Sequence, residues 1–153
     1  MIKFAVQLEA NGYDFYREVS SKLTAPVATA VFDDLARQEL EHKALFEGLG
    51  RQPEPPTVVE SYNGEYDSYL KAYVDSYVFT IERMKNILTR TRLDEKEAIQ
   101  FGIDSEKDTI LFYMGIKDAV RQTDRPVMDR IIVEERRHFA RLVQLLRDRY
   151  GKT

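Results

Sequence analysis

The residues best suited to chemistry in this sequence are four glutamates and two histidines in two matched sets. In each half of the chain one glutamate stands alone, and later a second glutamate is followed three residues on by a histidine. The six residues are Glu9, Glu39, His42, Glu106, Glu135 and His138. The chain has two histidines, and they lie 96 positions apart. Carboxylate and imidazole groups bind divalent transition metals, so the repeated set predicts a site for two metal ions.

The spacing within each pair suits an α-helix, because residues three apart lie on the same helix face. Four buried, ionised carboxylates would be strongly unfavourable alone, and two divalent cations would offset their charge while both imidazoles stay neutral. Mixed oxygen and nitrogen ligands suit iron or manganese better than zinc. We expect bridging carboxylates from Glu39 and Glu135, terminal carboxylates from Glu9 and Glu106, and one imidazole per metal from His42 and His138.

Residues near these ligands have two interpretations each. Tyr16 and Tyr113 follow the lone glutamates by seven residues, so their hydroxyls could hydrogen-bond the carboxylates and support the chemistry, or they are plain core aromatics. Gly12 and Gly102 leave space for a small oxidant or only permit close helix packing. Three polar neighbours of the ligands are interpreted as surface residues: Gln38, Glu41 and Glu134.

Four main helices must position this set, and apolar residues at steps of three and four predict them over residues 1–23, 26–49, 94–122 and 125–149. Residues 51–93 have no copy in the other half, and helical spacing returns over 66–89. This segment is expected to be a long crossover with one or two helices. The predicted fold is all-α: a four-helix bundle built as a two-fold repeat of helix pairs, 1–50 and 94–150, within one domain of residues 1–153.

The helix ends carry their own signals. Thr24 is the predicted N-cap of the second helix, with Pro26 in its first turn. Asp94 and Glu97 form a capping box, and the last helix is expected to be capped near Thr123-Asp124.

Composition limits the classes of function. A net charge of −3 gives no electrostatic case for binding nucleic acid or an anionic membrane. The absence of cysteine excludes disulfides, thiolate zinc sites and cysteine-ligated iron centres. Because Lys3, Gln7 and Glu9 interrupt the N-terminal apolar residues and no long apolar run follows, a cytoplasmic protein is expected.

The pattern resembles the ferritin-like di-iron carboxylate superfamily, and most closely its rubrerythrin branch. The resemblance rests on Glu9 with Phe15-Tyr16, Glu39-x-x-His42, Glu106 with Phe112-Tyr113, and Glu135-x-x-His138. It implies a ferritin-like bundle with two iron ions per chain, manganese or zinc being the other metals considered. The activity implied is reduction of H₂O₂ or O₂ at a diferrous site, and a homodimer is expected because the family commonly pairs bundles.

The sequence also departs from that family. Rubrerythrins usually carry a rubredoxin domain with four cysteines, which is missing here, so electrons are expected from an external donor protein or from Fe²⁺ itself. Thr109 stands where rubrerythrins tend to have an extra carboxylate. The alternatives are a ferroxidase or iron-handling protein without a storage cage, a di-iron hydroxylase of an organic substrate, and a bundle that metal merely stabilises.

Overall fold

The structure is a computed structural model that describes residues 1–51 and 64–151, and within these ranges it is helical and contains no strand. The helices are α1 (Ile2–Lys22), α2 (Pro26–Gly50), α3 (Glu65–Thr89), α4 (Glu95–Ile116) and α5 (Arg125–Tyr150), with a short 3₁₀ turn, η1 (Lys117–Ala119), after α4. The predicted all-α class and the four main helices are confirmed.

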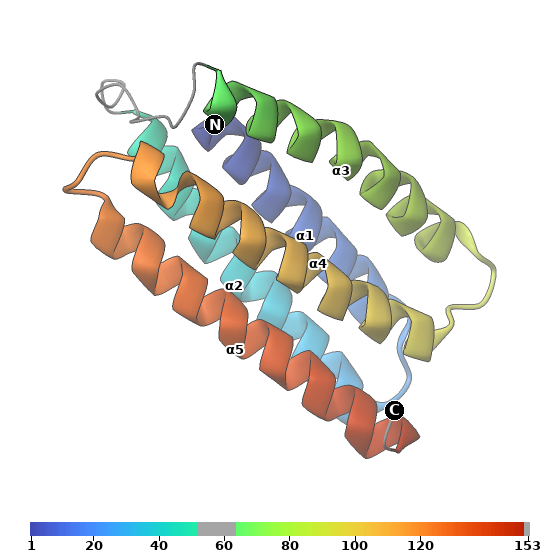
Figure 1. Cartoon of the computed structure of the whole chain (residues 1–153). Coiled ribbons are helices and arrows are strands. Elements are labelled where there is room, and N and C mark those ends of the chain that lie inside the picture. The colour runs from blue at the N-terminus through green and yellow to red at the C-terminus, as the bar shows by residue number, and fades with distance from the viewer. Residues whose placement is uncertain (52–63, 152–153) are drawn as a thin grey trace.

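Figure 1 shows how the helices are arranged. α1 and α2 form one antiparallel pair, α4 and α5 form the second, and the two pairs pack into a four-helix bundle. α3 runs the length of the bundle on the outside and contacts α1 and α4. The crossover therefore contributes one helix over its described part, and that helix covers the α1–α4 face.

The core consists of two apolar clusters, and the six candidate ligands lie between them on the four main helices α1, α2, α4 and α5. One cluster contains Phe15, Phe32 and Leu142, and the other contains Phe46, Phe112 and Ile131. On α1, for example, Leu8 belongs to one cluster and Phe15 to the other, with Glu9 between them. The apolar layers exclude water from both ends of the polar layer.

The predicted cap of α4 is correct, and the predicted cap of α2 is wrong. Asp94 caps α4 by accepting a hydrogen bond from the Glu97 backbone N–H at 3.1 Å. Gly64 precedes α3 with a φ of 80°, a conformation that glycine adopts without strain. Thr24 is not the N-cap of α2, because Pro26 begins the helix and Ala25 occupies that position.

The end of α4 differs from the expected range, whereas α5 begins at Arg125 as expected. α4 ends at Ile116 rather than near residue 122, because Val120 is extended and buries its side chain against the bundle. Asp124 occupies the N-cap position of α5 as predicted, but its carboxylate accepts a 2.6 Å hydrogen bond from Arg121 and none from a backbone N–H of the helix.

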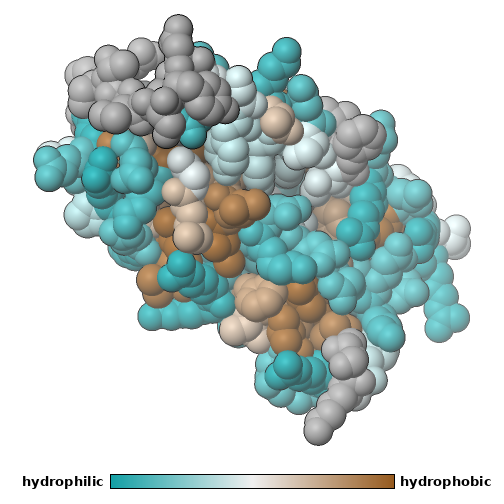
Figure 2. Space-filling model, in the orientation of Figure 1, coloured by the Kyte–Doolittle hydropathy of each residue, from teal (hydrophilic) through white to brown (hydrophobic). Residues whose placement is uncertain are grey.

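The surface is mainly hydrophilic, as the amphipathic pattern requires, with hydrophobic side chains visible over part of the face in Figure 2. Exposed apolar residues on α4 and α5 include Leu111, Met114 and Val133. None of the helices in the described ranges combines the length and apolar character needed to cross a bilayer.

Candidate metal centre

The six candidate ligands are buried at the middle of the bundle, where the four main helices face one another. Each is at most 5 % exposed, and each helix of the repeat contributes at least one of them. A buried acidic residue is rare unless it is paired or binds a metal. Burial of four glutamates at one level therefore requires that protons or cations offset their charge.

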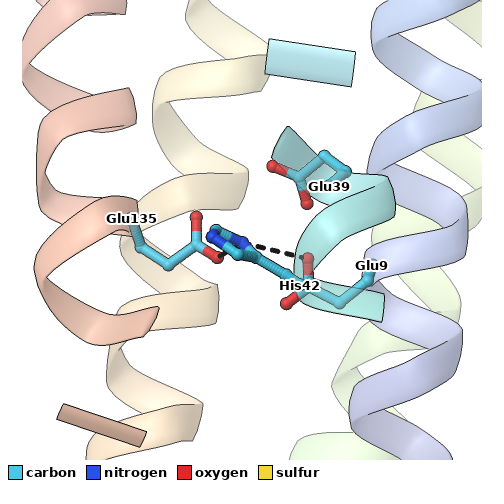
Figure 3. Close-up of side chains that lie close together, drawn as sticks. All are labelled: Glu9, Glu39, His42 and Glu135. Carbon is cyan, nitrogen blue, oxygen red and sulfur yellow. Dashed lines mark ion pairs between the residues drawn. The ribbon is translucent and has the colours of Figure 1, made fainter. Parts of the chain in front are cut away.

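The six side chains form two groups that share two members. In the first group, Glu9, Glu39, His42 and Glu135 present one ligand atom each within 4.8 Å of one another. Figure 3 shows these four side chains converging from α1, α2 and α5. The second group contains Glu39, Glu106, Glu135 and His138 at the same spacing. Because Glu39 and Glu135 occur in both groups, they occupy the positions expected of bridging ligands.

Glu135 lies between the two imidazole rings. Its Oε1 is 2.9 Å from Nδ1 of His42, and its Oε2 is 2.9 Å from Nδ1 of His138. The rings are nearly parallel, with centroids 5.5 Å apart. Both histidines thus direct Nδ1 into the centre and leave Nε2 for partners outside it.

The donor atoms of the centre fit a pair of metal ions. Several of them are buried without a hydrogen-bond partner: Oε2 of Glu9, Oε1 of Glu39, both oxygens of Glu135, and Nδ1 of both histidines. The two carboxylate oxygens of Glu135 each lie 2.9 Å from the Nδ1 of a histidine, but these contacts lack the geometry of a hydrogen bond. Orphaned buried polar atoms are costly in a folded protein, and convergence of oxygen and nitrogen donors on one space suits coordination.

The protonation states of the centre follow from burial and mutual repulsion. Burial, and then the charge of Glu135, raises the pKa of both Glu39 and Glu106 well above the ordinary value of a glutamate. Burial alone would raise the pKa of Glu135 too, but the two adjacent histidines lower it below the ordinary value. Burial alone would lower the pKa of His42, but the neighbouring Glu135 and Glu9 raise it to about 11.

Metal binding should therefore release protons. The raised pKa values of Glu39, Glu106 and His42 favour their protonated forms before metal binds, and each group must lose its proton to act as a ligand, so we expect binding of the ions to release protons. Because metal competes with these protons, metal affinity should rise with pH. Calorimetric titration with Zn²⁺ in buffers of different ionisation enthalpy measures the number released. Release of no protons would contradict these protonation states.

Tyr16 and Tyr113 each bond a lone glutamate, but in the opposite half of the repeat. The Tyr16 hydroxyl donates to Glu106, and the Tyr113 hydroxyl donates to Glu9. Both rings are also buried in the apolar clusters, so each tyrosine is a core aromatic as well as a hydrogen-bond partner of a carboxylate. These two hydrogen bonds, which we call the crossed bonds, connect α1 to α4 on the side that α3 covers.

The crossed bonds predict which ion each tyrosine supports. Tyr113→Phe removes the donor that orients Glu9 and should weaken the ion held with His42 by about tenfold, while Tyr16→Phe should weaken the ion held with His138. Competitive Zn²⁺ titration of each variant measures the two affinities, and Tyr13→Phe, at the edge of the core, is a control. Equal weakening of both ions by either variant would contradict the assignment.

Two residues interpreted as surface positions instead contact the histidines, so that interpretation is wrong for them. His42 Nε2 donates to Glu134 at 2.8 Å, and His138 Nε2 donates to Gln38 at 3.1 Å. Both precede a ligand glutamate by one residue, which places them beside the ligand face and next to the facing helix. Glu41, by contrast, is an exposed residue that pairs with Arg37.

The two glycines near the ligands differ in role. A Cβ on Gly12 would lie 2.8 Å from Oε2 of Glu39, so this glycine provides the space in which that carboxylate sits. A Cβ on Gly102 would lie 3.1 Å from a methyl of Leu142 and 3.4 Å from the Tyr16 ring, which indicates close helix packing.

A small cavity of about 40 Å³ adjoins the centre on the face that α3 covers. Its inner wall includes Glu9, Gly12, Glu39 and Glu106, and its outer wall includes Tyr73, Tyr77 and Met84 of α3. Thr109 also lines it. Since one water needs at least about 10–15 Å³ of such space, the cavity has room for about three water-sized molecules.

Comparisons with known proteins agree with this geometry. A family model described as Rubrerythrin matches residues 1–146. A solved structure from Thermotoga maritima, described as a ferritin-like diiron-carboxylate protein, has 24% sequence identity and a TM-score of 0.70, with 95% of this chain and 91% of that chain covered. At this identity the likeness establishes the fold. No curated protein matches the chain.

Proposed function

Because the chain belongs to the rubrerythrin family, we propose that it is a di-iron carboxylate oxidoreductase that reduces H₂O₂ or O₂. The proposal assigns the ligand roles to the residues that converge at the centre: Glu39 and Glu135 as bridges, Glu9 and Glu106 as terminal carboxylates, and His42 and His138 as one imidazole per ion. Two ferrous ions bound there would supply the two electrons that, with two protons, convert H₂O₂ to two molecules of water.

The chain's own residues contribute orientation and exclusion of water. Apolar layers above and below the centre keep bulk water out, which strengthens every electrostatic interaction inside it. The Tyr16 and Tyr113 hydroxyls hold protons against Glu106 and Glu9 and fix the direction of each carboxylate. Four carboxylates around two divalent ions give a neutral set when both imidazoles are neutral.

The size and position of the cavity beside Glu9, Glu39 and Glu106 support the choice of a small oxidant as substrate. Its volume of about 40 Å³ accommodates a diatomic molecule or H₂O₂ with both heavy atoms near the carboxylates. Pockets for organic ligands are usually several hundred Å³. This favours a small oxidant over hydroxylation of an organic substrate.

The proposal also includes an external electron donor protein, since the chain contains no cysteine for an iron–sulfur centre of its own. A di-iron centre that has been oxidised needs two electrons to return to the ferrous state.

Stopped-flow absorbance after anaerobic loading with two Fe²⁺ per chain tests the proposal. The loaded protein is mixed with equimolar H₂O₂ and, separately, with O₂-saturated buffer. Faster oxidation by H₂O₂ with iron retained supports a peroxidase, and faster oxidation by O₂ with iron retained supports O₂ reduction. Loss of Fe³⁺ from the chain after oxidation would replace the proposal with iron handling, and absence of oxidation by either reagent would refute it.

A further inference from the structure

The outer nitrogens of the two histidines have chemically different partners. Nε2 of His42 on α2 donates to the carboxylate of Glu134 on α5, and Nε2 of His138 on α5 donates to the amide oxygen of Gln38 on α2. Since Nδ1 of each ring faces the centre, an imidazole that binds metal through Nδ1 carries its one proton on Nε2. Each imidazole is therefore held by the helix that faces it.

Gln38 and Glu134 are equivalent in the repeat, because each directly precedes a ligand glutamate and they lie 96 positions apart. The repeat places two acceptors symmetrically, but one is charged and the other is neutral. The pseudo-two-fold symmetry of the centre is thus broken at one pair of positions.

The residues behind these acceptors do not cancel the difference. Arg130 donates to Glu134 at 3.1 Å, but its side chain is 62% exposed, and an exposed ion pair four residues apart on a helix is weak. Gln38 donates to Asp34 at 2.9 Å, and Asp34 also pairs with Arg37 and Arg141. A carboxylate thus touches His42 directly but is separated from His138 by an amide.

A carboxylate that accepts the outer N–H of an imidazole makes the inner nitrogen more basic and a stronger ligand, whereas an amide does so much less. We infer that the two metal positions are unequal, and that Glu134 is a positioning residue which makes the ion held by His42 bind more tightly than the ion held by His138. This inference rests on the proposed function, because it takes the two histidines to be ligands of separate ions. It adds an order of filling that the ligand list alone does not contain.

Stepwise addition of Zn²⁺ to the whole chain, followed by NMR of the imidazole nitrogens, tests this order. The chain has two histidines, so the spectrum contains two ring systems, and His138→Asn identifies the signals of His42. In the unsubstituted protein the first equivalent of Zn²⁺ should shift the His42 ring, and the second should shift the His138 ring. Simultaneous shifts of both rings, or filling at His138 first, would overturn the inference.

Two variants make the test specific. Glu134→Gln should weaken the His42 position by about 10–100-fold, so that both rings shift together. The double swap Gln38→Glu with Glu134→Gln keeps the net charge and should reverse the order of filling. Glu41→Gln makes the same charge change as Glu134→Gln at an exposed position, and the original order should remain.

The outcomes separate this inference from the function on which it depends. If Zn²⁺ shifts neither ring, the histidines are not ligands and the proposed function fails. If Zn²⁺ shifts both rings but the double swap leaves the order unchanged, the proposed function stands and the role of Glu134 is refuted.

Discussion

Replacing Glu135 by Gln should remove both metal ions from the chain, because this side chain belongs to both ligand groups. Each of its oxygens is 2.9 Å from Nδ1 of a different histidine, and an amide offers one weak oxygen donor where the carboxylate offers two. The affinity for each ion should fall by more than about 100-fold, beyond the usual cost of losing an outer partner of a ligand. Metal analysis after gel filtration with Fe²⁺ or Zn²⁺ measures the loss.

Glu9→Gln and Glu106→Gln provide the matched comparison, since each of these residues belongs to one group only. Each should retain one ion per chain, and the imidazole that still responds to Zn²⁺ identifies which one. Glu41→Gln should retain both ions. A Glu135→Gln protein that keeps one ion would show that Glu135 is not a bridge.

Gln is preferable to Ala at this position because it preserves the volume of the buried side chain. Removing one partner of a buried charge pair is strongly destabilising, by about 3–5 kcal/mol. Unfolding followed by circular dichroism therefore accompanies the metal analysis, so that loss of metal from a folded chain is distinguished from loss of the fold.

The convergence of the six buried side chains was predictable from sequence because helix geometry converts sequence spacing into a shared face. Glu39 and His42 lie three residues apart, and the second half repeats the pair at the same spacing. Burial of charged residues inside an apolar pattern is unusual enough to identify a site. The assignment of these residues as ligands remains a prediction, and the experiments above test it.

The hydrogen bonds around the ligands were not predictable in the same way. The crossed pairs Tyr16–Glu106 and Tyr113–Glu9 depend on how α1 packs against α4, and spacing within one helix contains no information on that packing. Gln38 and Glu134 occupy positions that a single helix turns toward solvent, and the facing helix brings a histidine to them. Their matched places in the repeat were the one available signal.

The extent of α4 shows another limit of periodic patterns. Val120 continues the apolar spacing of that helix, but it reaches the core from an extended backbone after a 3₁₀ turn. The spacing of apolar residues indicates which side chains are buried, but it does not specify the backbone conformation that buries them.

Gly12→Ala should have opposite effects on the stability of the metal-free protein and on its affinity for metal. In the interior of α1, alanine is more favourable than glycine by about 1 kcal/mol, so urea unfolding in the presence of a chelator should show a gain approaching that value. The new methyl group would lie 2.8 Å from Oε2 of Glu39, at the end of a flexible side chain that can rotate away in the metal-free protein.

Rotation of Glu39 removes a carboxylate from both ligand groups, so Zn²⁺ titration should show weaker binding of both ions. Gly48→Ala is the control, because no atom lies within 4 Å of its added Cβ, and metal affinity should be unchanged. If Gly12→Ala bound metal as tightly as the unsubstituted protein, the space at Gly12 would not serve Glu39. A gain in stability combined with a loss of metal would instead show that this glycine is kept in the helix for the carboxylate it accommodates, at the expense of the helix itself.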